Sequence, residues 1–136
     1  MRKSIVTAPG IGGTYSATTA HATEAGNFLF VTGQVANKPG TDPARAPEEV
    51  GEMGTLEEQT TRVLENIKSI LEAAGTSFDK VVKRNVYLTH PEDYITVYKL
   101  MERYFTSRVA STGVVTGLIP ASARVEIEVI AVIPDP

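Results

Sequence analysis

The chain of 136 residues contains no cysteine and no tryptophan. Without cysteine it has no disulfide, no cysteine-ligated zinc, no iron–sulfur cluster and no thiol nucleophile. Basic residues are also scarce, since 13 Lys and Arg stand against 16 Asp and Glu, and the formal net charge is -3. A surface that binds nucleic acid needs clustered Lys and Arg, so we expect no nucleic-acid partner.

Long apolar runs are absent as well. No segment approaches the roughly 20 apolar residues that a membrane-spanning helix needs, and residues 1–9 lack the apolar stretch of a signal peptide. We therefore expect no membrane partner and a cytoplasmic location. The hydrophobic fraction of 42% and the charged fraction of 21% are typical of a globular chain. The length predicts one domain over residues 1–136.

Side chains that bind metals or phosphates are few. His21 and His90 are the two histidines, and they stand far apart in the sequence. Glu126 and Glu128 by themselves make a weak case for a carboxylate site, so we expect no metal. The glycine-rich residues 10–15 lack the last glycine of a Gly-x-Gly-x-x-Gly loop and are interpreted as a turn.

Hydrophobic periodicity predicts strands and two helices. Thr55 and Glu58 form a capping box before an apolar stripe at helical spacing, and Gly75 is a natural end for that helix. A second helix is expected to start at residues 89–92, and residues 36–54 are predicted to form a long loop. The expected strands are residues 4–7, 15–22, 28–35, 81–88, 112–118 and 124–132, and the inner stripe of the second helix is Tyr94, Tyr98, Met101 and Phe105.

This order of elements predicts an α+β fold, in which a mixed sheet is backed on one face by two helices. The other face of the sheet then needs a cover of its own. Residues 28–31 and 130–133 are continuously apolar, and the first of these runs is interpreted as buried on both faces. An oligomer is the simplest way to cover them.

Among acids and bases, Glu126 is the notable residue, because its neighbours Val125 and Ile127 are apolar. A carboxylate in this position either faces solvent beside Glu128 or lines a cavity. In a closed pocket, desolvation would raise its pKa and suit it to proton transfer through a water molecule. Tyr15 follows the glycine-rich turn and either reaches a pocket or packs at an edge or interface.

Several segments, in order, resemble the Rid family, the reactive-intermediate deaminases also called YjgF-type proteins. The resemblance covers residues 12–133, almost the whole chain. The segments that carry it are residues 28–34 (FLFVTGQ), 58–67 (EQTTRVLENI), 71–75 (LEAAG), 81–83 (VVK), 93–94 (DY), 119–121 (IPA) and 125–128 (VEIE).

The resemblance implies a chorismate-mutase-like fold and a homotrimer whose sheets associate into a barrel, with small-molecule pockets at the subunit interfaces. Deaminating members hydrolyse 2-imino or enamine acids to 2-keto acids and ammonia, without a metal or organic cofactor. An arginine clamps the substrate carboxylate, and a glutamate positions the attacking water. A tyrosine near the N-terminus and a Ser/Thr-Gly-Gln segment complete the pocket.

Carried over by position, the catalytic glutamate is Glu126, and Tyr15 and the Thr32-Gly33 pair are substrate-binding residues. We also predict Tyr87 in that role. The arginine does not carry over, because Ser111 stands in its place. Gly113 stands where the family has a pocket cysteine, and Glu92 where it has an asparagine. Ser111 and Gly113 are nevertheless predicted as substrate-binding residues, because of the positions they occupy.

Two arginines are candidates to replace the missing one. Arg108 lies three residues upstream of Ser111, and Arg124 lies two residues before Glu126, where strand alternation would put both side chains on one face. Serine supplies neither the charge nor the planar fork of arginine, so specificity for the substrate is expected to differ.

Three functional hypotheses follow. The favoured one is a Rid-like hydrolase or deaminase that acts on a reactive imine or enamine through a water positioned by Glu126. The alternatives are a non-catalytic trimeric binding protein for a small metabolite, or a specialised-pathway enzyme that uses the same pocket for another reaction. A ribonuclease activity, also attributed to the family, is disfavoured by the acidic net charge.

Overall fold

The computed structural model describes residues 3–12, 14, 16–36 and 53–135. Within these residues the strands and α-helices follow the predicted order, and two short 3-10 turns lie at Phe78–Lys80 and Pro91–Asp93. No helix in the described part of the chain is both long and apolar enough to span a membrane. The elements are β1 (Lys3–Val6), β2 (Ala22–Ala25), β3 (Phe28–Gln34), α1 (Leu56–Ala73), β4 (Val81–Leu88), α2 (Tyr94–Met101), β5 (Ala110–Val115) and β6 (Val125–Val132).

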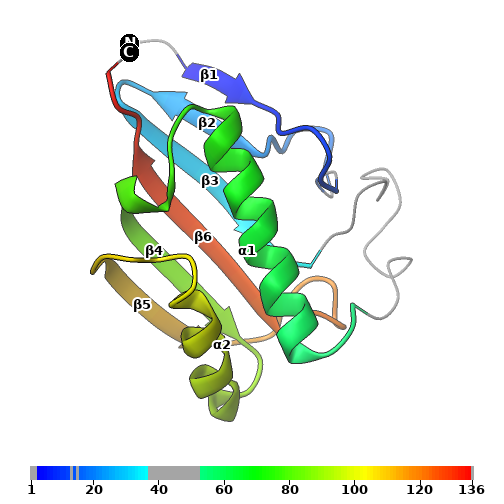
Figure 1. Ribbon diagram of the computed structural model, residues 1–136. Helices are drawn as coiled ribbons and strands as arrows, with labels where there is room; N and C mark the ends of the chain where they lie inside the picture. The colour runs from blue at the N-terminus through cyan, green and yellow to red at the C-terminus, as the bar shows by residue number, and fades with distance from the viewer. Residues whose placement is uncertain (1–2, 13, 15, 37–52, 136) are drawn as a thin grey trace.

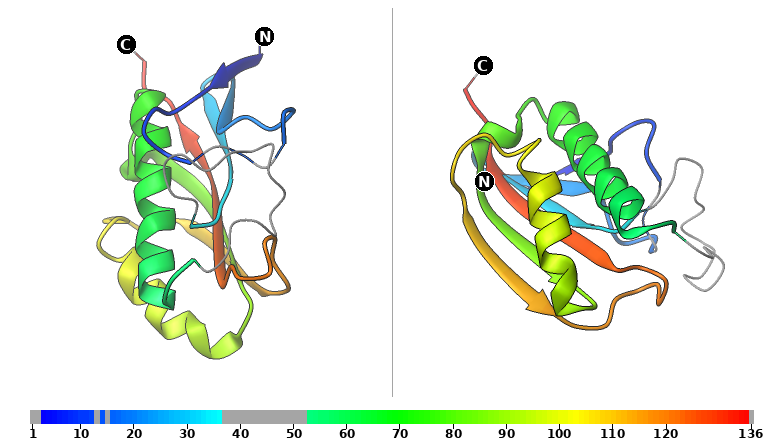
Figure 2. Two further views of the ribbon diagram at one scale, coloured as in Figure 1. Left: turned by 90° about the vertical axis from the view of Figure 1, so that its right-hand side faces the viewer. Right: turned by 60° about the horizontal axis from the view of Figure 1, so that its bottom comes forward.

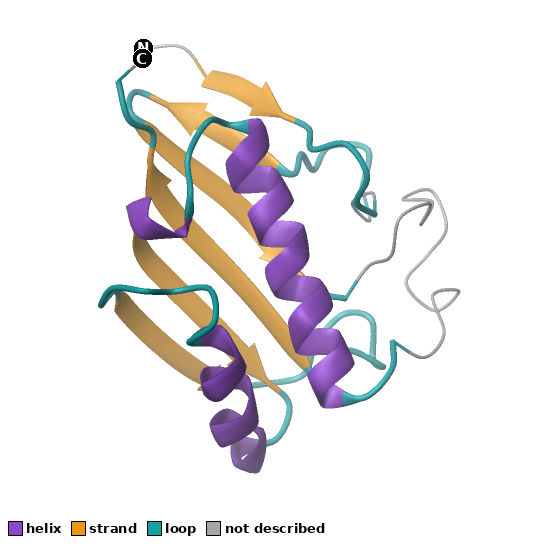
Figure 3. Cartoon of the chain, in the orientation of Figure 1, coloured by secondary structure: helices purple, strands orange, loops and turns teal. Residues whose placement is uncertain are grey.

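The strands form one sheet in the order β1-β2-β3-β6-β4-β5 (Figure 1). Neighbouring strands are antiparallel except β4 and β5, which are parallel because α2 connects them. Both α-helices cover the same face, as the edge-on view in Figure 2 and the helices and strands in Figure 3 show. The predicted α+β arrangement, a mixed sheet backed by two helices, is therefore confirmed.

Two predicted strands differ from the structure. Residues 16–21 form turns, whereas a strand was expected over residues 15–22, and Tyr15 lies outside the described residues. The Thr14 hydroxyl donates to the carbonyls of Ser16 and Thr19, at 3.0 and 2.7 Å. Such local bonds compete with strand pairing and explain why this Ser/Thr-rich stretch does not extend β2. The strand expected over residues 112–118 lies two to three residues earlier, at β5.

Helix α1 confirms its capping box. The Thr55 hydroxyl accepts from the Glu58 backbone N–H at 3.2 Å, and the Glu58 carboxylate accepts from the Thr55 N–H at 3.0 Å. Its predicted stripe forms the centre of the core, and Gly75 follows with a φ of 78°, a left-handed conformation that favours glycine. The apolar α1 side chains with no exposed surface are Val63, Leu64, Ile67, Ile70 and Leu71.

The buried amide of Gln59 connects the start of α1 to the segment before β6. Its Nε2 donates to the carbonyls of Gly54 and Ser122 at 3.1 and 3.3 Å, and its Oε1 accepts from the Arg124 N–H at 2.8 Å. One side chain therefore satisfies three backbone groups, as buried polar groups require. This network fixes where β6 enters the sheet.

The stripe predicted for α2 is partly wrong. Tyr94 is 55% exposed, whereas Val97 and Met101 are fully buried. A 3-10 turn over residues 91–93 precedes the helix, so α2 begins only at Tyr94 and its core face repeats as 97, 101 and 105. Tyr94 instead contacts Tyr98, with ring centroids 4.8 Å apart.

The described residues leave the sheet face opposite the helices uncovered. Along β3, Leu29 and Val31 are buried under α1, but Phe28 and Phe30 are 47% and 44% exposed. Residues 28–31 are therefore not buried on both faces within one chain, in contrast to the interpretation of their continuous apolar run. The alternation is that of a sheet with one covered face.

Replacing Thr55 with alanine should lower the free energy of unfolding by about 1 kcal/mol, because it removes the capping hydroxyl from α1. Urea denaturation of the two proteins measures the difference. Thr61→Ala is the matched control, since Thr61 is exposed inside the same helix and alanine favours helix there. Equal losses in the two variants would contradict the role of the cap.

Candidate functional site

The open face of the sheet carries a group of polar side chains on its three central strands. Glu126 and Glu128 come from β6, which lies between β3 and β4. Tyr87 and Asn85 of β4 stand directly opposite them, in the register Tyr87 to Glu126 and Asn85 to Glu128. Alternation along β6 buries Val125, Ile127 and Val129 under the helices, so the two carboxylates face the uncovered side.

Glu128 is held by its neighbours. Its Oε1 accepts a hydrogen bond from the Tyr87 hydroxyl at 2.7 Å and another from the Asn85 amide at 2.9 Å. The bond from Tyr87 to the carboxylate raises the pKa of Tyr87, with smaller contributions from burial and from both negative charges. Glu128 is therefore an acceptor held in place by two donors, and the Tyr87 hydroxyl is already engaged with it.

The Glu126 carboxylate is in the opposite situation, because it accepts no hydrogen bond from any other described residue. Burial raises the pKa of its carboxyl, and the nearby charge of Glu128 raises it further. Its carboxylate lies against Gly33, where a Cβ would overlap Oε2 and approach Cδ to 3.0 Å. Of the two carboxylates, Glu126 is the one that is both partly desolvated and available.

The Thr32-Gly33 pair lies beside Glu126 at an irregularity in β3, where the register with β6 shifts between Val31 and Gln34. Thr32 donates its hydroxyl to the Ala20 carbonyl at 2.6 Å, so that hydroxyl is already engaged. Gly33 has no side chain, and this leaves room for the Glu126 carboxylate. The structure thus brings Thr32, Gly33, Tyr87 and Glu126 together, and the predicted Tyr15 lies outside the described residues.

Ser111 and Gly113, the other two predicted substrate-binding residues, lie on the opposite face. A Cβ at Gly113 would come within 3.0 Å of the Tyr98 hydroxyl, which places this position beside α2. Ser111 is paired with Arg84 in the parallel register of β5 and β4, and its hydroxyl accepts from Arg84 Nε at 2.9 Å. These two residues therefore do not meet Glu126 within one chain.

The two arginines proposed as substitutes have different surroundings. Arg124 does not share a face with Glu126 as expected, because β6 begins only at Val125. Its guanidinium Nη2 instead bonds both oxygens of the buried Asp93, at 2.8 and 3.0 Å. Arg108 lines a cleft between α2 and the segment before β5, and Arg84 lines the same cleft.

Arg84 and Asn85 are the residues that sequence reasoning missed. Both lie in β4, which its apolar residues identify as a strand. Each bonds to a residue on a neighbouring strand, Ser111 or Glu128, that the local sequence does not reveal. A charged residue inside a predicted inner strand is a usable signal, because buried charges need partners.

His21 has a structural role. The Ala8 N–H donates to its Nδ1 at 2.9 Å, so Nε2 carries the proton and donates to the Gly12 carbonyl at 3.0 Å. His90 lies elsewhere, with Nδ1 4.0 Å from the Asp93 carboxylate. Among the described residues, no three His, Asp or Glu side chains are grouped as a metal site would need.

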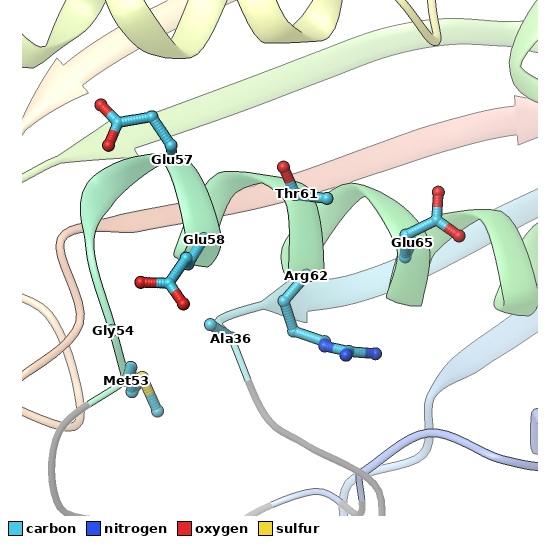
Figure 4. A pocket seen from close by; sticks show the side chains of 8 residues that line it. All are labelled: Ala36, Met53, Gly54, Glu57, Glu58, Thr61, Arg62 and Glu65. Atoms are coloured by element: carbon cyan, nitrogen blue, oxygen red, sulfur yellow. The ribbon is translucent and has the colours of Figure 1, made fainter.

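A hollow of about 420 Å³ lies along the first turns of α1 (Figure 4). Two of its carboxylates already have structural partners, since Glu58 closes the capping box and Glu65 accepts from the Tyr104 hydroxyl at 2.7 Å. Glu57 and Glu58 point away from each other in this view. The open face around Glu126 is therefore the better candidate for chemistry.

The raised pKa of Glu126 should appear directly in a ¹³C NMR titration of its carboxyl group. Glu128→Gln removes the neighbouring charge and should move the midpoint to lower pH, whereas Glu24→Gln, a change on β2, should leave it in place. A midpoint for Glu126 at or below the ordinary value for glutamate would contradict the desolvated environment.

The same shift has a consequence for stability. Because the folded pKa is raised, the folded chain binds more protons than the unfolded chain between the two pKa values. The contribution of Glu126 to stability is thus complete below the ordinary pKa and is lost as pH rises through the raised one. Glu126→Gln should therefore be more stable than the parent at pH 7, by an amount that shrinks in acid. Urea unfolding across this range tests it, and an advantage that grows in acid would contradict it.

Comparisons with known proteins give a consistent result. The model of the family described as endoribonuclease L-PSP matches residues 7–133. A RutC family protein of Pyrococcus horikoshii is 40% identical over 115 residues, 82% of this chain and 84% of that protein. The mouse 2-iminobutanoate/2-iminopropanoate deaminase is 34% identical over 137 residues, 97% of this chain and 92% of that protein.

A solved structure supports the same grouping. A Rid-family protein of unknown function from Yersinia pestis superposes with a TM-score of 0.83 at 28% identity, over 97% of this chain and 100% of that one.

Proposed function

Because this chain belongs to the endoribonuclease L-PSP family, which includes the RutC and Rid proteins, we propose that it hydrolyses a small imine or enamine to a carbonyl compound and ammonia. The observation that carries the proposal is the state of Glu126. Its carboxylate is partly buried, has no hydrogen-bond donor among the described residues and has a raised pKa. The mouse relative is named as a deaminase of such compounds, which supports the substrate class.

The reaction needs one base that later serves as an acid. Glu126 takes a proton from a water molecule while the water oxygen forms a bond to the imine carbon. The proton then passes to the nitrogen and gives a carbinolamine. Glu126 next takes the proton of the carbinolamine hydroxyl as the carbonyl forms and delivers it to the nitrogen, so that the carbon–nitrogen bond breaks and ammonia leaves. An enamine enters the same sequence after a proton shifts from nitrogen to carbon and gives the imine. Water and imine supply every atom, so no cofactor is needed.

The surroundings of Glu126 suit this cycle. A carboxylate with its ordinary pKa is a weak base at neutral pH, and burial makes it a better one. Glu128 adds to that effect through its charge, while its bonds from Tyr87 and Asn85 hold it in place. Gly33 leaves the space that the Glu126 carboxylate occupies.

Replacing Glu126 with glutamine should reduce the rate of imine hydrolysis by about 100-fold or more, the range expected for loss of a general base. The measurement is stopped-flow decay of 2-aminoacrylate generated in the cuvette. Glu24→Gln is the control and should retain the parent rate. If the parent protein gives no acceleration at high enzyme concentration, the deaminase proposal fails for this substrate.

A non-catalytic binding protein is the second candidate, favoured by the absence of an arginine at position 111. That outcome would appear as thermal stabilisation by a keto acid without turnover of the corresponding imine. The family description names an endoribonuclease, but the net charge of -3 gives little attraction for RNA.

The proposal includes assembly as a homotrimer through the open sheet face. Phe28 and Phe30 expose nearly half their surface there, and a second and third copy would cover them. Covering this face would also close the space above Glu126 and exclude bulk water, which the raised pKa requires for its full effect.

Phe30→Glu should shift the protein from trimer to monomer, because it places a charge where apolar surface would be buried. Light scattering coupled to gel filtration gives the mass directly. Lys68→Glu, on the exposed side of α1, changes charge in the same sense and should keep the parent mass. A monomeric parent protein would refute the assembly.

A further inference from the structure

A second polar site lies on the helix side of the sheet, in the cleft between α2, β4 and the segment that precedes β5. The cleft measures about 540 Å³, and its lining includes two arginines, Arg84 and Arg108, together with Ser107 and Thr106. Glu102, which directly follows α2, is the one carboxylate among the described residues of that lining. Neither the two carboxylates of the open face nor the hollow beside α1 contributes to it.

Arg84 is held in this cleft by three neighbours, Tyr98, Phe105 and Ser111. Its guanidinium lies over the ring of Phe105, 4.6 Å from the centroid, and 5.5 Å from that of Tyr98. Its Nε donates to Ser111 at 2.9 Å. The stacking fixes the plane of the fork, and the single bond to Ser111 fixes its rotation.

The remaining donors of Arg84 have no partner within the part of the chain that the structure describes. Among the described residues, no carboxylate forms an ion pair with it, in contrast to Arg124, which is bound to Asp93. Burial lowers the pKa of Arg84, which is the direction expected for a cation partly removed from water with no anion beside it. A half-buried guanidinium without a counter-charge is costly, and an anionic ligand would offset that cost.

We propose that Arg84 binds the carboxylate group of this protein's ligand, in the cleft beside Ser111. Ser111 is the position at which the family resemblance places an arginine, and Arg84 stands directly across from it on the neighbouring strand. Arg84 on β4 thus supplies the positive charge that Ser111 on β5 lacks, and its Nε lies 2.9 Å from the Ser111 hydroxyl. This inference rests on the proposed function in one respect, which is that the ligand also carries the imine or enamine group to be hydrolysed.

The geometry favours a planar carboxylate over a tetrahedral phosphate. With Nε bonded to Ser111 and the ring planes confining the guanidinium, the two terminal nitrogens present one flat edge, which matches the two oxygens of a carboxylate. Such a pair is a charge-assisted contact, so loss of Arg84 should weaken binding substantially and not marginally.

The test measures binding, independently of turnover. Titrations of 2-oxobutanoate and of inorganic phosphate are followed by calorimetry with the parent protein and with Arg84→Met, which keeps the apolar stem over Phe105. Loss of the charged pair should weaken 2-oxobutanoate binding by at least about 10-fold. Arg103→Met, the same change at an exposed position outside the cleft, should bind as the parent does.

A relocation variant gives a second measurement. Arg84→Ser combined with Ser111→Arg moves the guanidinium one strand outward and should recover most of the binding that Arg84→Ser alone loses. Unchanged binding in Arg84→Met, no recovery on relocation, or phosphate binding as tight as 2-oxobutanoate binding would each overturn the proposal, as would a parent protein that binds neither probe.

Failure here and failure of the proposed hydrolysis are distinguishable. Binding of 2-oxobutanoate needs no proton transfer, so calorimetry reports on Arg84 whether or not the protein hydrolyses an imine. A parent protein that binds the keto acid through Arg84 but does not accelerate imine decay would retain this inference and refute the hydrolase.

Discussion

The period-2 alternation of β6 is the constraint on which the rest of the structure depends. This strand lies in the middle of the sheet and pairs with both β3 and β4. Its odd-numbered residues, from Val125 to Ala131, are buried under α1 and α2. Its even-numbered residues must therefore face the other side, and two of these are the carboxylates Glu126 and Glu128. The same alternation that builds the core thus sets the candidate chemistry on the uncovered face.

The neighbours then make the two carboxylates unequal. Both glutamates have the same charge and the same kind of strand position, and sequence alone gives no reason to choose between them. Register supplies the reason, because Asn85 and Tyr87 of β4 both direct their donors to one oxygen of Glu128. Glu126 receives none of these bonds and instead lies against the bare backbone of Gly33. Burial raises the pKa of the Glu126 carboxyl, and the nearby charge of Glu128 raises it further.

Much of the fold could be predicted from local patterns. The capping box at Thr55, the stripe along α1 and the alternation of β6 each depend on residues close in sequence, and each prediction holds. The failures involve interactions that a short segment does not reveal. Residues 16–21 contain β-branched residues but satisfy their backbone through nearby hydroxyls. Tyr94 fits the helical period, yet the preceding 3-10 turn rotates it away from the core.

The candidate site was predictable only in part for the same reason. Position-by-position resemblance identified Glu126 and its neighbours on the open face, and it also identified the gap at Ser111. It could not identify Arg84, because the cation that reaches Ser111 comes from another strand and becomes its neighbour only through the parallel pairing of β4 and β5. A change of one residue at a site can be compensated wherever the fold brings a second residue close, and that information lies in register.

The positions of Arg84 and Glu126 restrict how the proposed ligand is bound. The two residues lie on opposite faces of the sheet, so one small molecule cannot touch both within a single chain. Strand β5 is an edge strand whose residues are all exposed, and the open face of the sheet exposes Phe28 and Phe30. If the edge of one copy meets the open face of the next, both surfaces are covered by the same contact. Carboxylate binding by Arg84 and proton transfer by Glu126 would then come from different subunits, and catalysis would require the assembly as well as the fold.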